Sequence, residues 1–75
     1  MKIKAKLFAS LRKKLGKSEC ELDLSLGSRV LDAIRELNLS EKDSYVLMLN
    51  GIHCQMDQEL TDGDVLSIFP MIAGG

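Results

Sequence analysis

Residues 2–8 alternate strictly between two kinds of side chain. Lysines followed by Phe8 occupy one face, and apolar residues occupy the other: Ile3, Ala5 and Leu7. A period of two is that of a half-buried strand, because successive side chains point to opposite faces of a sheet. Residues 19–24 repeat the alternation, with acidic residues on one face and three apolar residues on the other: Cys20, Leu22 and Leu24. The pattern therefore predicts two strands of the antiparallel type, with Phe8 pointing outward beside the lysines.

A helical period follows at residues 28–38. The apolar residues there share one face of a helix: Val30, Ala33, Ile34 and Leu37. Ser28 is predicted to open this helix and Asn38 to close it, after about three turns. A shorter helix is predicted after residue 8, with Ser10 as its cap and Gly16 as the left-handed residue that ends it.

Turn residues mark the boundaries of the remaining strands. Asn50-Gly51 lies between two apolar runs and predicts a type I′ hairpin turn. Asp62-Gly63 predicts a turn before a last strand over residues 65–69. Pro70 is expected to end that strand, because proline has no N–H to give to a neighbouring strand.

These elements together predict the fold class. One amphipathic helix can cover one face of a mixed sheet of four or five strands, which makes a two-layer α+β domain. Parallel pairing of the first and last strands gives the β-grasp (ubiquitin-like) arrangement. We expect residues 1–70 to form this domain. Residues 71–75 are expected to form a flexible tail that ends in Gly-Gly, since glycine loses the most conformational freedom on ordering.

Composition excludes several classes of function. A chain of 75 residues has room for one domain. Ten basic residues against eleven acidic ones leave a net charge of −1, which argues against nucleic acid as the main partner. No apolar run approaches the roughly 20 residues that span a bilayer, and the N-terminus is unlike a signal peptide. We therefore expect a cytoplasmic protein with no membrane partner, in which Cys20 and Cys54 are reduced.

The charged residues are spread unevenly. Lysine and arginine gather in the first quarter of the chain, and acidic residues gather near its end: Asp57, Glu59, Asp62 and Asp64. A patch of one sign usually keeps a small domain soluble, and the acidic end is suited to steering a basic partner. The acidic residues lack the spacing of a calcium loop. His53 and Cys54 are adjacent on a strand and point to opposite faces, so we expect no metal site there.

Four segments together resemble a known family. They are KLFASLRKKLG, LNG, LTDGDVLSIFP and the terminal GG, and they span the whole chain. In this order and at this length the chain resembles the ubiquitin-like sulfur carriers, which comprise the small subunit of molybdopterin synthase (MoaD) and the thiazole sulfur carrier (ThiS). The helix expected after LFASLR and the FP before the tail are similar to the molybdopterin branch. The ending MIAGG is similar to the thiazole branch, since molybdopterin carriers more often have a second proline at the position of Met71.

The resemblance implies a chemistry for the end of the chain. A ubiquitin-activating-like adenylyltransferase of the MoeB type would use ATP to adenylate the Gly75 carboxylate, and sulfur transfer would convert it to a thiocarboxylate. The large subunit of molybdopterin synthase would then receive that sulfur for the molybdopterin dithiolene. The chain itself would bind no cofactor and would be a non-catalytic, sulfur-carrying subunit.

The resemblance also implies which residues meet the partners. Gly75 would be the reacting residue, and the binding residues would lie in the tail and on a nearby face: Gly74, Ala73, Ile72, Met71, Pro70, Phe69, Phe8 and His53. At about 3.3 Å per residue, residues 70–75 would reach roughly 20 Å into a partner. Phe8 and Phe69 fall on the strand parity opposite the helix, so they are expected to form an exposed apolar patch, with His53 at its rim.

Three other functions fit parts of the pattern. The first is a sulfur carrier for thiamine thiazole synthesis. The second is a ubiquitin-like modifier whose Gly75 carboxylate is joined to lysines of target proteins. The third is a β-grasp binding module with no activated terminus, which leaves the two glycines unexplained.

Overall fold

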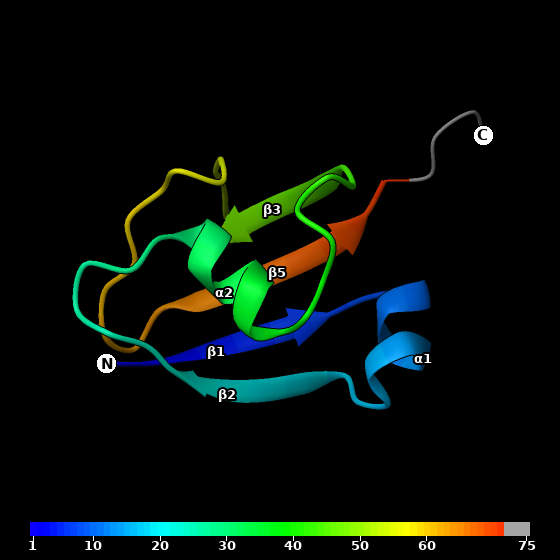
Figure 1. Ribbon diagram of the computed structural model, residues 1–75, viewed down its shortest axis with the longest axis horizontal. Helices are drawn as coiled ribbons and strands as arrows, with labels where there is room; N and C mark the ends of the chain where they lie inside the picture. The colour runs from blue at the N-terminus through cyan, green and yellow to red at the C-terminus, as the bar shows by residue number, and fades with distance from the viewer. Residues whose placement is uncertain (72–75) are drawn as a thin grey trace.

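The computed structural model describes residues 1–71 of the chain. Five strands form one sheet in the order β2-β1-β5-β3-β4. Their bounds are β1 Lys2–Leu7, β2 Glu19–Asp23, β3 Tyr45–Leu49, β4 Ile52–His53 and β5 Val65–Pro70. Helix α2 (Val30–Glu36) lies across one face of this sheet, and helix α1 (Ser10–Leu15) sits beyond the end of β1 (Figure 1). The predicted β-grasp fold is therefore confirmed.

The two central strands run parallel, as predicted. Lys4 of β1 pairs with Val65 of β5, and Leu7 pairs with Ile68. The other pairs, β1 with β2, β5 with β3 and β3 with β4, are antiparallel. Because β1 and β5 point the same way, the last residues of both strands reach the same end of the sheet, where α1 also lies (Figure 1).

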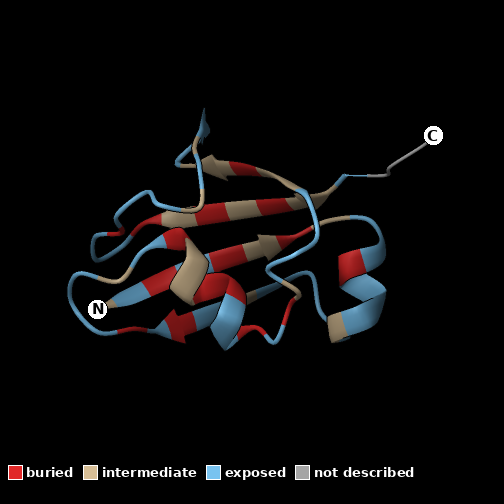
Figure 2. Ribbon diagram, turned by 45° about the horizontal axis from the view of Figure 1, so that its top comes forward, coloured by how far each residue is buried: buried red, intermediate tan, exposed pale blue. Residues whose placement is uncertain are grey.

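The alternation read from the sequence decides which face is buried. Figure 2 shows buried bands alternating with exposed or intermediate ones along β1 and β5, and the buried side of α2 turned toward them. The fully enclosed side chains come from β1, α2 and β5: Ile3, Ala5, Leu7, Val30, Ala33, Ile34, Leu66 and Ile68. Burial of aliphatic side chains of this size contributes roughly 1.5–3 kcal/mol each, which makes this layer the main source of stability.

Helix α2 is shorter than predicted. It has seven residues, about two turns, and begins at Val30 rather than at Ser28. Arg29 still has extended backbone, and its N–H donates to the Asp32 carboxylate at 2.8 Å. The Val30 N–H donates to the Gln58 carbonyl at 2.9 Å, so contact with residues 56–58 determines where the helix starts. Asn38, with a φ of 58°, closes it as predicted.

The hairpin turn is confirmed, and the cap of α1 is corrected. Asn50 and Gly51 both have positive φ, 52° and 83°, as a type I′ turn requires. Ser10 does not cap α1 but is its first residue. The cap position is Ala9, whose φ of 54° and ψ of −132° lie where glycine is favoured. Such a conformation costs other residues about 1–3 kcal/mol, and here it turns the chain sharply from Phe8 into α1.

The turn before β5 is held by Asp64, which is only 8% exposed. Its two carboxylate oxygens accept hydrogen bonds from the Thr61 N–H at 2.8 Å and from the Asn50 side-chain amide at 2.9 Å. The Asn50 side-chain oxygen in turn accepts from the Val65 N–H at 2.9 Å. Burial alone would raise the pKa of Asp64, but these hydrogen bonds outweigh burial, and the pKa is lowered. The network joins the β3–β4 hairpin to the start of β5.

Replacing Asp64 with alanine is expected to destabilise the domain by about 1–3 kcal/mol at neutral pH, because it leaves the Thr61 and Asn50 donors unpaired. Since the folded pKa lies below the unfolded value, the stabilisation is fully present above the unfolded pKa, about 3.9, and is lost as pH falls through the folded pKa. Urea titrations across acidic pH should therefore show that the free energy of unfolding falls less with decreasing pH for D64A than for the native chain. The exposed Asp57, replaced by asparagine, serves as the control, and an equal effect of both substitutions would contradict the role of Asp64.

Candidate functional site

No helix of residues 1–71 covers the face of the sheet opposite α2, and the strand register arranges the side chains of this face in rows. One row crosses all five strands: Glu19, Lys6, Ser67, Met48 and His53. A neighbouring row pairs Val46 with Phe69. The β1 and β2 half of this open face is charged, with lysines opposite acidic residues, and the β5 and β3 half is mostly apolar. The open face thus offers an apolar area bordered on one side by charge.

Phe8 and Phe69 form the centre of that apolar area. Their rings stack with centroids 4.2 Å apart and planes inclined by 14°. Both side chains are half-buried and neither belongs to the core. The Arg12 guanidinium lies 5.5 Å from the Phe8 ring centre, and its Nε donates to the Leu7 carbonyl at 3.0 Å. We call Phe8, Phe69 and Val46 the aromatic patch; its partly exposed, pre-ordered rings are of the kind that anchor protein interfaces.

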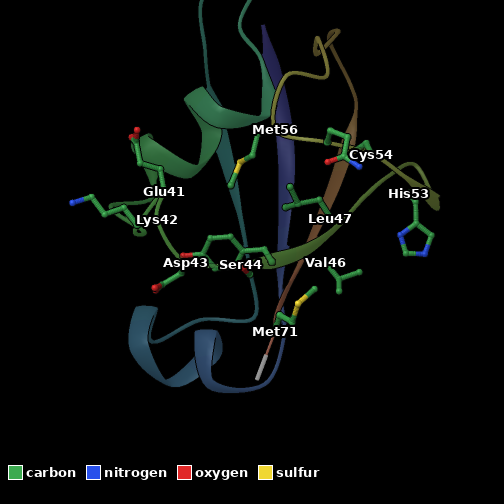
Figure 3. Close-up of a pocket in the computed structure, with 12 residues that line it drawn as sticks. Glu41, Lys42, Asp43, Ser44, Val46, Leu47, His53, Cys54, Met56 and Met71 are labelled. Atoms are coloured by element: carbon green, nitrogen blue, oxygen red, sulfur yellow. The ribbon is translucent and has the colours of Figure 1, made fainter. Parts of the chain in front are cut away.

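His53 lies at the edge of the open face, as the sequence predicts. It sits on β4 opposite Met48 and is exposed. Its ring points away from Cys54, whose thiol has a pKa raised by burial (Figure 3). Among residues 1–71, no three His, Cys, Asp or Glu side chains gather closely enough to hold a metal ion. His53 is thus placed as a rim residue of the open face.

The chain leaves the sheet at a well-defined point. Pro70, the last residue of β5, pairs with Tyr45, and the Met71 N–H donates to the Ser44 carbonyl at 3.1 Å. Met71 is 54% exposed and lines an open groove of about 660 Å³ with residues 41–47 and 53–56 (Figure 3). On its other side a second hollow is lined by Leu11, Lys14 and Pro70 among others. The remaining predicted tail residues, Ile72, Ala73, Gly74 and Gly75, lie outside the described residues.

The loop beside this exit is anchored at two points. The Glu41 carboxylate accepts two hydrogen bonds from the Arg35 guanidinium, at 2.6 and 3.1 Å. This pairing raises the pKa of Arg35 and lowers that of Glu41. The Tyr45 hydroxyl donates to the Ser40 carbonyl at 2.8 Å. Residues 41–44, held at Glu41, border the departing chain at Met71.

Val46 and Met48 belong to the open face but were not predicted there. The segment YVLML is apolar throughout, so its sequence does not show which residues face the helix. The pairing of Val46 with Phe69 and of Met48 with Ser67 assigns them to the open side. The signal that could have identified them was the hairpin turn at Asn50-Gly51 taken together with the parity of β5.

The arrangement of residues 1–71 groups several of the predicted site residues. It brings Phe8, Phe69 and His53 to one face and places Pro70 and Met71 at the end of that face. No helix formed by these residues has both the length and the apolar content needed to cross a bilayer. The described part can present an apolar surface to another protein while the chain continues from its end.

Comparison with known proteins gives a consistent picture. The model of the ThiS family matches residues 5–75. Molybdopterin converting factor subunit 1 of Pyrococcus furiosus is 32% identical over 96% of this chain and 99% of its own, with a TM-score of 0.82. Small archaeal modifier protein 1 of Haloferax volcanii is 24% identical over the whole of both chains, with a TM-score of 0.84.

A third similar structure is a complex. It contains subunits 1 and 2 of the molybdopterin-converting factor of Helicobacter pylori, and its matching chain is 18% identical over 100% of both chains, with a TM-score of 0.67. At that identity the likeness shows the fold alone. No protein among the curated sequences matches the chain.

Proposed function

Because the chain belongs to the ThiS family and has the fold that MoaD-like carriers share with small archaeal modifiers, we propose that it is the sulfur-carrying small subunit of a molybdopterin synthase. The observation that carries this proposal is the 32% identity to molybdopterin converting factor subunit 1 over nearly the whole of both chains. The chain is then a carrier and not itself a catalyst.

The proposed chemistry takes place at Gly75. A carboxylate oxygen of Gly75 attacks the α-phosphorus of ATP in an activating enzyme of the MoeB type, and pyrophosphate leaves. Hydrosulfide then attacks the acyl carbon of the adenylate: the C–S bond forms as the C–O bond to AMP breaks, AMP leaves, and loss of the S–H proton gives the thiocarboxylate. Carboxylate oxygen is a poor nucleophile, and the sulfur that replaces it is a good one. The catalytic groups and the ATP site belong to the partner in this scheme.

The domain supports this chemistry by positioning the tail. Phe69 of the aromatic patch immediately precedes the exit at Pro70 and Met71, so an enzyme docked on the open face lies close to the start of the tail. Gly74 and Gly75 have no Cβ, which lets the last two residues pass through a narrow channel. The proposed receiving partner is the large subunit of the synthase, by analogy with the two-subunit complex of Helicobacter pylori.

Intact-mass measurement tests the proposal. The purified chain is incubated with a soluble extract of its own cell, ATP and a sulfur donor, and is then recovered and weighed. We expect a mass gain equal to one sulfur replacing one oxygen, located by fragmentation at Gly75 and absent without ATP. No gain in the presence of all components would overturn the carrier role.

A second candidate function is a ubiquitin-like protein modifier. It is favoured by the likeness to small archaeal modifier protein 1, which covers the whole of both chains. The same incubation separates the two functions, because a modifier would appear joined through Gly75 to lysines of other proteins. A carrier for thiazole synthesis would gain the sulfur but would not transfer it to the large subunit of a molybdopterin synthase.

A further inference from the structure

One end of the domain carries a dense set of exposed cations. Helix α1 and the residue pair after it contain no acidic side chain. Lys42 lines one hollow together with Lys14, Pro70 and Met71. We call these cations the basic end: Arg12, Lys13, Lys14, Lys17 and Lys42, all of them exposed. The chain therefore leaves the domain between positive side chains.

These cations are not neutralised within residues 1–71. The ion pairs in that part of the chain join the N-terminus to Asp23, Lys2 to Glu21 and Arg35 to Glu41. None of them involves the basic end. Of the two acidic residues in the facing loop, Glu41 is already paired with Arg35, which leaves Asp43. The basic end thus keeps a clear net positive charge.

The opposite end of the domain is acidic. Asp57 and Glu59 are exposed in the loop before β5, and Asp62 follows at the next turn; these three outnumber Arg29, whose guanidinium donates to the Asp57 carbonyl at 3.3 Å. Figure 1 shows this loop and α1 at opposite ends of the long axis, along which the domain extends 36 Å. The lysines of β1 add little to this polarity, because the register sets Lys2, Lys4 and Lys6 opposite acidic residues of β2. The molecule is therefore electrically polar, with its positive end at the tail.

We propose that the basic end recognises an acidic protein surface at the entrance of the pocket that receives the tail. This inference rests on the proposed function, since it assigns a surface property to the activating enzyme. Charges at the rim of an interface act mainly on the association rate. At physiological ionic strength the Debye length is about 8 Å, so the near end of the domain interacts with the partner while the acidic end, 36 Å away at most, is screened. The polarity turns the tail toward the pocket before contact.

A protein surface fits these charges better than a nucleic acid. The net charge of the chain is −1, and a polyanion that extends along the domain would meet the acidic end. A local ring of carboxylates on an enzyme would attract the basic end without also meeting the acidic end. Recognition of this kind also leaves the aromatic patch free to supply the binding energy.

The test compares two charge variants in the activation reaction. Lys13→Gln with Lys14→Gln removes two positive charges at the basic end. Ser25→Glu with Gln58→Glu changes the net charge equally at the acidic end. The ratio kcat/KM of the activating enzyme, purified from the same cell, is measured for each carrier by the rate of ATP-dependent sulfur gain at about 0.1 M salt, where the Debye length is about 10 Å, and at about 1 M salt, where it is about 3 Å.

At low salt the Lys13/Lys14 variant should lose about tenfold in kcat/KM with kcat unchanged, and the loss should vanish at high salt. Lys13→Arg with Lys14→Arg should restore the native rate, and the Ser25/Gln58 variant should also have the native rate.

Equal kcat/KM for all variants at both salts would overturn the inference while the carrier function stands. Failure of the native chain to gain sulfur would overturn both. Binding of the native chain to a single-stranded RNA probe, lost in K13Q/K14Q, would also overturn the inference.

Discussion

Deleting Gly75 is expected to abolish sulfur loading of the chain. The shortened chain still ends in a carboxylate, that of Gly74, but its reach from the exit at Pro70 and Met71 is shorter by about 3.3–3.6 Å. Misplacing a reacting atom by about 1 Å already costs on the order of a hundredfold in rate, so a shift of this size removes the reaction. The measurement is the intact mass after incubation with extract, ATP and a sulfur donor.

Two further variants separate length from residue type. Deleting Ala73 leaves a Gly-Gly ending but shortens the tail by the same amount, and it should also abolish loading. Ala73→Gly keeps the length and should load like the native chain. Sulfur gain by the chain that lacks Gly75 would contradict the proposed role of the last residue, and normal loading after deletion of Ala73 would show that reach does not matter.

The sheet was predictable because its central strands alternate cleanly. In β1 every second residue is buried, and in β5 Leu66 and Ile68 are, so the sequence shows both the element and its inner face. The glycine and asparagine turns were equally clear, since positive φ at Asn50, Gly51 and Gly63 leaves few residue types to choose from. The alternation of apolar residues and the residue types of turns are both visible within a few consecutive residues, so they can be recognised in the sequence.

The errors fall where tertiary contacts decide. Ser28 is a good helix cap, yet α2 starts at Val30, because the N–H groups of Val30 and Leu31 bond to the carbonyls of Gln58 and Met56. Serine is a better helix cap than alanine, so the sequence favoured Ser10 over Ala9. The Leu11 N–H donates to the Phe8 carbonyl at 3.2 Å, however, and this tight turn places Ala9 at the cap position. At Val30 a partner distant in sequence overrides side-chain preference, and at Ala9 a tight turn does so.

The candidate site was predictable in part for the same reason. Phe8 and Phe69 could be assigned to the open face by parity, and their stacking follows from the adjacency of β1 and β5. The exit groove could not be predicted, because it depends on how residues 41–44 are anchored by Arg35 and Tyr45. Sequence parity identifies faces, whereas hollows depend on how loops pack.

Replacing Phe69 with lysine is expected to weaken binding to the large subunit by about 2 kcal/mol or more, roughly a 30-fold rise in Kd. The substitution removes one ring of the stacked pair and puts a charge at the centre of the aromatic patch. The fold should survive, since lysine can lay its stem along the sheet and keep its ammonium in water. Loss of the stack costs the domain about 1 kcal/mol. The measurements are Kd by calorimetry and the free energy of unfolding by urea titration.

The neighbouring residue provides the opposite case. Ile68 is fully buried on the α2 side of the same strand, so Ile68→Val should cost about 0.5–1.5 kcal/mol of stability and leave Kd unchanged. The two substitutions are on adjacent residues of β5, so their distances from the tail differ by one residue, and they alter opposite faces of the sheet. If I68V weakens binding as much as F69K does, or if F69K leaves Kd unchanged, the open face is not the docking surface. If only F69K weakens binding, the open face of β5 is the docking surface, and its buried face, where Ile68 lies, contributes to stability alone.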